Sequence, residues 1–156
     1  MRRPYLLATA VVLTTALAVG LWLGLSGGGK AQPTRASYLE HVSAVCRSYA
    51  RRLERVPAPT DPAAYGDVIA SLDSVVPLLR AQEAAMRALP APPALGPRLE
   101  RLFALNRTSI AELERALAAA GRRDAGGVAT RLVRFSSVRD RVHRFALAIG
   151  IRCNPN

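Results

Sequence analysis

The sequence predicts an all-α protein, in which an N-terminal transmembrane helix is followed by a four-helix bundle of up-down-up-down order. An uncharged apolar run of 21 residues lies near the start of the chain. Four later segments place apolar residues at steps of three and four, and Pro- or Gly-rich breaks separate these segments. About 125 residues follow position 30, which is enough chain for one domain with a core.

The apolar run Tyr5–Leu25 would span about 31 Å as a helix, which matches the hydrocarbon core of a bilayer. Arg2 and Arg3 precede it, so the positive-inside tendency favours residues 1–4 in the cytoplasm and the rest of the chain outside. The sequence therefore predicts a single-pass protein of the cell membrane.

A cleaved signal peptide is the alternative. Such peptides have an apolar core of about 7–15 residues and a small-x-small cleavage site. This run is longer, and only Gly29-Lys30-Ala31 offers a poor site. The anchored form is favoured, and a secreted form stays open.

Small residues at Ala16, Gly20 and Gly24 share one face of the predicted span. Small residues at this spacing let two membrane helices approach closely. They predict a homodimer contact, although such residues are common in membrane spans in general.

After a flexible linker at 26–34, the predicted extracytoplasmic domain covers 35–156. Its first helix is expected at about Thr34–Val56, with Ser37 and Glu40 at the spacing of a capping box. The second is expected to start at Asp61 and Pro62, to run to about Leu89 and to be kinked at Pro77.

The third helix should open at Pro97 and close at Gly121. The fourth should start near Asp124 and end at Gly150, with Ile151 as the apolar residue after the cap. Short connections between four amphipathic helices are typical of a bundle.

Cys46 and Cys153 are the two cysteines, and a disulfide is the expected state in an exported chain. In a simple bundle, however, they would lie about 25 Å apart along the axis. Three solutions remain: the connection Val56–Pro62 lets the first helix slide, the chain reverses after Gly150, or the bond joins two chains. The first is favoured.

The net charge is +11, and Arg supplies 21 of the 22 basic residues. Codon bias in a GC-rich genome explains the Arg excess more simply than a functional need does. The charge still predicts attraction to anionic lipid or an acidic wall polymer, whereas an outward-facing domain without a nucleic-acid motif is not expected to bind nucleic acid.

On the first helix, an arginine stripe would contact such anions or form a solvated face. It comprises Arg47, Arg51, Arg52 and Arg55.

Two polar residues, Gln82 and Asn106, fall on the apolar stripes of the second and third helices. In antiparallel helices they should lie at the same height along the bundle axis and form a hydrogen bond with each other. The pair would fix the register of the helices, as a buried Asn does in coiled coils. Alternatively, it would line a ligand cavity.

Enzymatic motifs are missing from the sequence. No nucleophile elbow, phosphate loop or zinc spacing is found. Asp140-x-x-His143 is most simply a surface pair, and the other histidine, His41, is predicted to lie too far away to share a metal with it. No catalytic residue, metal or cofactor is therefore expected.

The chain resembles a loose class of uncharacterised small exported or membrane-anchored helical proteins of actinobacteria. The resemblance rests on the Arg/Ala-rich composition, Tyr38 before Val45-Cys46, the Pro-rich first and second connections and Gly150-Ile151-Arg152-Cys153. It implies an all-helical domain and favours the disulfide, and it carries no activity with it.

The expected function is that of a non-enzymatic, membrane-anchored domain outside the cell, which acts by binding or as a component of the cell envelope. The alternative is a secreted bundle, freed by cleavage of the leader, that carries a small apolar ligand.

Overall fold

The computed structural model describes residues 32–61 and 64–153. Every regular element in these ranges is a helix, as predicted, and the four long helices belong to one compact unit that begins at Pro33. In order, the elements are α2 (Arg35–Leu53), α3 (Tyr65–Arg87), the short 3-10 helix η1 (Pro93–Leu95), α4 (Gly96–Gly121) and α5 (Ala125–Ile149).

The predicted membrane span at 5–25 lies outside the described residues, and so does its proposed dimer face. Among the helices that are described, none combines the length and the apolar character needed to cross a bilayer.

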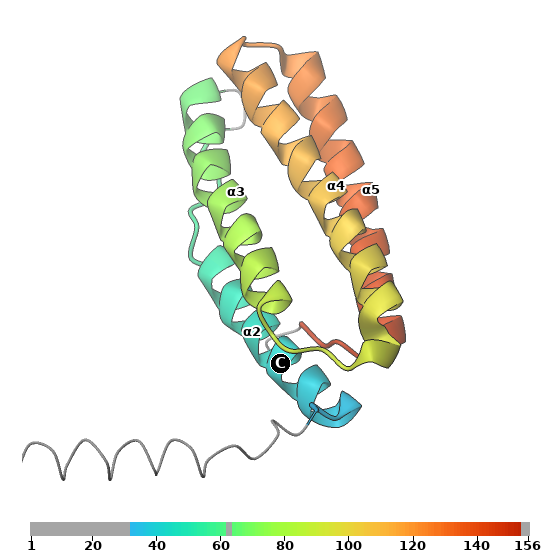
Figure 1. Cartoon of the computed structure of the whole chain (residues 1–156). Coiled ribbons are helices and arrows are strands. Elements are labelled where there is room, and N and C mark those ends of the chain that lie inside the picture. The colour runs from blue at the N-terminus through green and yellow to red at the C-terminus, as the bar shows by residue number, and fades with distance from the viewer. Residues whose placement is uncertain (1–31, 62–63, 154–156) are drawn as a thin grey trace, which may run out of the picture. The chain divides into compact units, whose positions relative to one another are not determined.

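Consecutive helices run in opposite directions and pack on one another (Figure 1). α4 makes its most extensive contacts with α5, followed by those with α3, and α2 contacts α3. α2 is the shortest of the four and lies beside the C-terminal part of α3 (Figure 1), because a non-helical connection separates the two helices in the chain. The domain therefore has a fourth helix at one end only.

The buried apolar residues form two clusters, one at each end of the domain. The cluster beside α2 joins that helix to the ends of α3, α4 and α5 and to the chain after α5, and Tyr38 and Val42 are almost fully buried in it. The other cluster lies mainly between α3 and α4, where Leu79 and Leu113 are each 2 % exposed. Tyr38, which lies next to the predicted apolar stripe, is also only 2 % exposed.

The start of α2 near Thr34 is confirmed, but the cap differs from the predicted capping box. Thr34 is the N-cap, and its Oγ1 accepts a hydrogen bond of 3.2 Å from the backbone N–H of Ser37. Ser37 is thus inside the first turn instead of capping it, and the predicted capping box does not mark the start. α2 ends at Leu53, three residues before Val56.

The start of α3 differs from the prediction. The helix begins at Tyr65, with Ala64 in the cap position, and not at Asp61. The hydroxyl of Thr60 instead donates to the carboxylate of Asp67 in the first turn, and this hydrogen bond lowers the pKa of Asp67. Pro77 lies inside an unbroken α3 on an exposed position.

The predicted ends of α5 are confirmed. The Asp124 carboxylate accepts a hydrogen bond of 2.8 Å from the N–H of Gly127. Gly150 adopts φ 98° at the C-terminus, and the N–H of Ile151 donates to the carbonyl of Ala146 at 2.9 Å. This left-handed cap turns the chain back after α5.

Candidate functional site

A disulfide joins Cys46 of α2 to Cys153 within one chain, with 4.9 Å between the Cα atoms and a sequence separation of 107. After the turn at Gly150, the chain runs beside α2, where the N–H of Arg152 donates to Ser43 Oγ at 3.1 Å. The amide Nε2 of Gln82 lies 3.3 Å from Cys46 Sγ, so Cys46 of α2 lies beside Gln82 of α3.

Two of the three predicted solutions for the disulfide therefore act together. A short hairpin between α2 and α3 would place Cys46 near residue 72 of α3, whereas the structure places it near Gln82. This is a slide of roughly 15 Å along the helix. The chain reversal at Gly150 closes the remaining distance between the two cysteines, because it carries Cys153 back toward α2.

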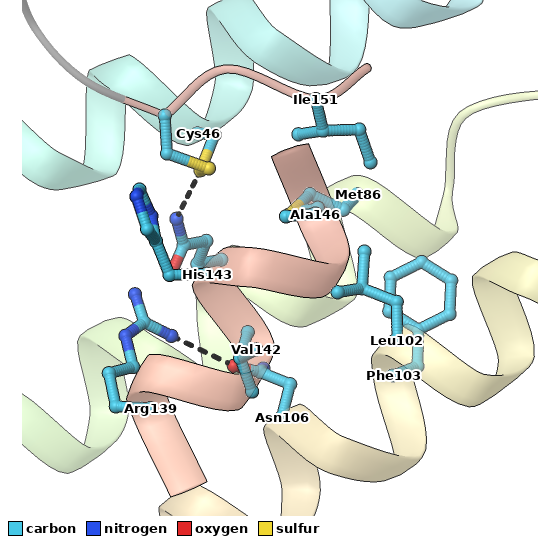
Figure 2. A pocket seen from close by; sticks show the side chains of 12 residues that line it. Cys46, Met86, Leu102, Phe103, Asn106, Arg139, Val142, His143, Ala146 and Ile151 are labelled. Carbon is cyan, nitrogen blue, oxygen red and sulfur yellow. Dashed lines mark hydrogen bonds between the residues drawn. A yellow bond between two sulfur atoms is a disulfide. The ribbon is translucent and has the colours of Figure 1, made fainter. Parts of the chain in front are cut away.

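Beside the disulfide, a cavity of about 60 Å³ lies among α2, α3, α4, α5 and the C-terminal segment (Figure 2). Most of its lining is apolar and comes from α3, α4 and α5, and its polar lining is confined to a few side chains. The lining residues are Cys46, Gln82, Met86, Leu102, Phe103, Asn106, Arg139, Val142, His143, Ala146, Ile151 and Cys153.

Arg139 supplies the positive charge of this cavity. Its Nη1 donates to Oδ1 of Asn106 at 3.1 Å (Figure 2). Burial lowers the pKa of the Arg139 guanidinium from its ordinary value, and an Arg still stays protonated under such conditions. No carboxylate in the described ranges forms an ion pair with it.

Asn106 links this guanidinium to a buried carboxylate. Its Nδ2 donates to Oε2 of Glu83 at 2.9 Å. Oε1 of Glu83 accepts from Arg87 Nε at 3.0 Å and from Arg107 Nη1 at 3.3 Å. Glu83 therefore already has two guanidinium partners, and Arg139 reaches it only through the amide of Asn106.

A second buried carboxylate, Glu112, is paired in a similar way between α4 and α5. It accepts from Arg131 Nη1 at 3.2 Å and forms a close ion pair with Arg115. Burial acts to raise the pKa of Glu112, but the hydrogen bond from Arg131 and the charges of both arginines outweigh it, so that the pKa is lowered.

Gln82 and Asn106, the predicted polar pair, are both buried and line the same cavity. They are not bonded to each other, however. The amide of Gln82 is directed at Cys46, whereas that of Asn106 joins Glu83 and Arg139. The two residues lie at the same height along α3 and α4, as predicted, but the predicted hydrogen bond between them is wrong. The register of two helices sets the height of each residue, whereas the direction of its side chain depends on how each helix is rotated about its axis.

The arginine stripe lies at the C-terminal end of α2 and just beyond it. Arg51, Arg52 and Arg55 are exposed and Arg47 is half-buried, and Arg52 stacks on the ring of Tyr49 at 4.9 Å. Within 32–61 and 64–153, no carboxylate forms an ion pair with any of the four.

Sequence reasoning missed Arg139 and Glu83. A signal for Arg139 was present, since it lies four residues after Phe135 and three before Val142, on the apolar side of its helix. His143, predicted from the sequence as half of a surface pair with Asp140, is exposed and lines the cavity. In the described part of the chain, no group of three or more His, Cys, Asp or Glu side chains is arranged to hold a metal ion.

Comparison of the chain with protein-family models, with curated proteins and with solved structures finds no match.

Proposed function

We propose that the chain is a membrane-anchored protein whose helical domain lies outside the cytoplasm and acts by binding, as a component of the cell envelope. The observation that carries the proposal is the Cys46–Cys153 disulfide. Disulfides persist in oxidising compartments and are rare in the cytosol, where thiols are kept reduced.

The uncharged run at 5–25 and the arginines before it support the same placement. In this proposal the run stays attached as the anchor, and its small residues Ala16, Gly20 and Gly24 would allow two copies to pair in the membrane.

The partner that we propose is an anionic surface of the envelope, either lipid headgroups or an acidic wall polymer. Without Arg2 and Arg3, the remaining charge is +9. The arginine stripe adds a local cluster of guanidinium groups without carboxylate partners in the described ranges. Guanidinium groups bind phosphate and carboxylate oxygens through paired hydrogen bonds.

The size of the cavity argues against a carrier of a drug-sized apolar molecule. Its volume of about 60 Å³ is well below the roughly 300–1,000 Å³ of pockets that hold such ligands. A secreted form would thus differ from the anchored one in its attachment, and any ligand that it carries in this cavity would have to be smaller than a drug-sized molecule.

Two measurements in intact cells test the proposal. Alkaline phosphatase fused after Asn156 should be active, because it folds only outside the cytoplasm, and the same fusion to a chain lacking 5–25 should be inactive. In denatured, unreduced lysate, the two cysteines should resist alkylation until a reductant is added.

Activity of the fusion without 5–25, or rapid alkylation before reduction, would contradict the proposed location. Mass spectrometry of the mature N-terminus separates the anchored chain from a secreted one, since a cleaved leader removes the residues before the cut.

A further inference from the structure

We propose that the cavity beside the disulfide binds a small carboxylate, whose carboxylate group pairs with the guanidinium of Arg139 and whose short alkyl chain lies on the apolar walls. The inference rests on the proposed function only in taking the domain to act by binding. It holds for an anchored or a secreted chain alike.

The first argument is charge. A guanidinium has five N–H donors, and the acceptor that the described residues offer to Arg139 is Oδ1 of Asn106. Arg139 is half-buried, and a charge that is partly removed from water is stabilised by a partner of opposite sign. The nearest carboxylate in this network, Glu83, is shared with Arg87 and Arg107. Glu100 also pairs with Arg87, so the cluster has three guanidinium groups and two carboxylates. A bound anion would correct this excess of positive charge.

The second argument is the direction of the polar groups. Arg139 and His143 lie one turn apart on α5 and line the same cavity as Asn106 (Figure 2). His143 is exposed, so it lies where the cavity meets solvent and can offer a further N–H to an anion entering there. The site has an open, polar end that a charged group can reach.

The third argument is the nature of the walls. Met86, Leu102, Phe103 and Val142 are each no more than 8 % exposed and give the cavity an apolar interior. A carboxylate with a short alkyl chain can place its charged group at the polar end of the cavity and its alkyl chain against the apolar walls. Inorganic phosphate would turn polar oxygens toward these walls, and burial of such groups without partners is unfavourable.

The fourth argument is size. A water molecule needs about 10–15 Å³ of such space, so a cavity of about 60 Å³ accommodates a ligand of roughly four to five non-hydrogen atoms. Acetate and propionate have this size. Hexanoate is too long for the cavity as it stands.

The test is calorimetric titration of the full chain, purified in detergent with its disulfide intact, with sodium acetate, propionate, hexanoate and phosphate at constant ionic strength. Propionate should bind saturably, and hexanoate and phosphate should each bind about tenfold more weakly or not at all. Absence of saturable binding of acetate and propionate, or equal binding of phosphate, would overturn the proposal.

The matched variants are Arg139→Gln and Arg141→Gln, which remove the same charge from α5 inside and outside the cavity. R139Q removes the charged, bidentate hydrogen bonds between the guanidinium and the ligand carboxylate, which should weaken propionate binding by about tenfold or more. R141Q should bind like the unchanged chain, and equal affinity of all three proteins would overturn the assignment to Arg139.

The ligand series on the unchanged chain decides the proposal even if R139Q does not fold, because it needs no variant. A failure of this series also differs from a failure of the proposed function, since the calorimetry does not depend on where the protein resides in the cell.

Discussion

Arg139 of α5 donates to Asn106 of α4 at 3.1 Å, and the same amide donates to the buried Glu83 of α3 at 2.9 Å. One side chain thus connects three helices through its two polar atoms. An amide suits this position because it offers an acceptor to the guanidinium and a donor to the carboxylate.

Replacement of Asn106 by Leu should therefore destabilise the domain, although it adds an apolar residue to an apolar stripe. Arg139 would lose its acceptor and Oε2 of Glu83 its donor, while Oε1 of Glu83 would keep its two arginine partners. A buried polar atom left without a partner costs about 1–3 kcal/mol. Urea unfolding of Asn106→Leu measures the loss, and Thr108→Leu, at an exposed position of α4, is the control. A gain in stability in N106L would mean that the network is dispensable for folding.

Reduction of the disulfide should lower the free energy of unfolding by about 4–5 kcal/mol in the chain-entropy model, because the sequence separation of the two cysteines is 107. The double variant Cys46→Ala, Cys153→Ala should show a similar loss, and reductant should not change it further. Urea unfolding with and without reductant measures both. Equal stability of the oxidised and reduced protein would contradict a stabilising bond.

The tight turn at Gly150 makes a separate prediction. Its φ of 98° is unfavourable for an L-residue, and an added Cβ would lie 3.0 Å from Cδ1 of Leu39. Gly150→Ala should destabilise the domain by about 1–2 kcal/mol. At Gly66, in α3, no atom lies within 4 Å of such a Cβ, so Gly66→Ala should be neutral or stabilise by up to about 1 kcal/mol. Thermal unfolding compares the two, and equal effects would contradict the structure of the turn.

Acid should weaken the domain partly through Glu112. Its pKa is lower in the folded protein than in the unfolded chain, where Glu titrates near 4.3. The stabilisation is thus complete at pH values above the unfolded pKa and is lost as the pH falls through the folded pKa. In urea titrations across this range, the stability gap between the unchanged chain and Glu112→Gln should close as the pH falls. A gap that stays constant would contradict the pairing of Glu112 with Arg115 and Arg131.

The helices were predictable from the sequence because apolar spacing and Pro or Gly breaks are local signals. The cap at Asp124 and the turn at Gly150 were found in this way. The start of α3 was missed because Asp61 and Pro62 form a typical helix start, whereas the hydroxyl of Thr60 bonds instead to the Asp67 carboxylate inside the helix.

The candidate site was predictable only in part. Counting from the connection between α3 and α4 correctly placed Gln82 and Asn106 at one level. The partners of Asn106 depend on how α3, α4 and α5 are rotated about their axes, and no single-helix pattern contains this information. Arg139 and Glu83 become neighbours of one amide only through that rotation.

The arginine stripe leads to the last prediction. Substitution of Arg47, Arg51, Arg52 and Arg55 by Gln should weaken binding to an anionic surface, because each basic residue near such a surface contributes about 1 kcal/mol.

The full chain in detergent is applied to beads that carry poly(glycerol phosphate), and separately to beads coated with anionic or neutral lipid. The control protein has four exposed arginines from elsewhere replaced by Gln, namely Arg122, Arg123, Arg134 and Arg141. The first variant should elute at lower salt than the control, although both have lost the same charge. A preference for the polymer beads or for the anionic lipid beads identifies which surface the domain contacts. Equal elution of the two variants, or retention that does not respond to salt, would show that the stripe is an ordinary solvated face, because exposed ion contacts weaken as ionic strength rises.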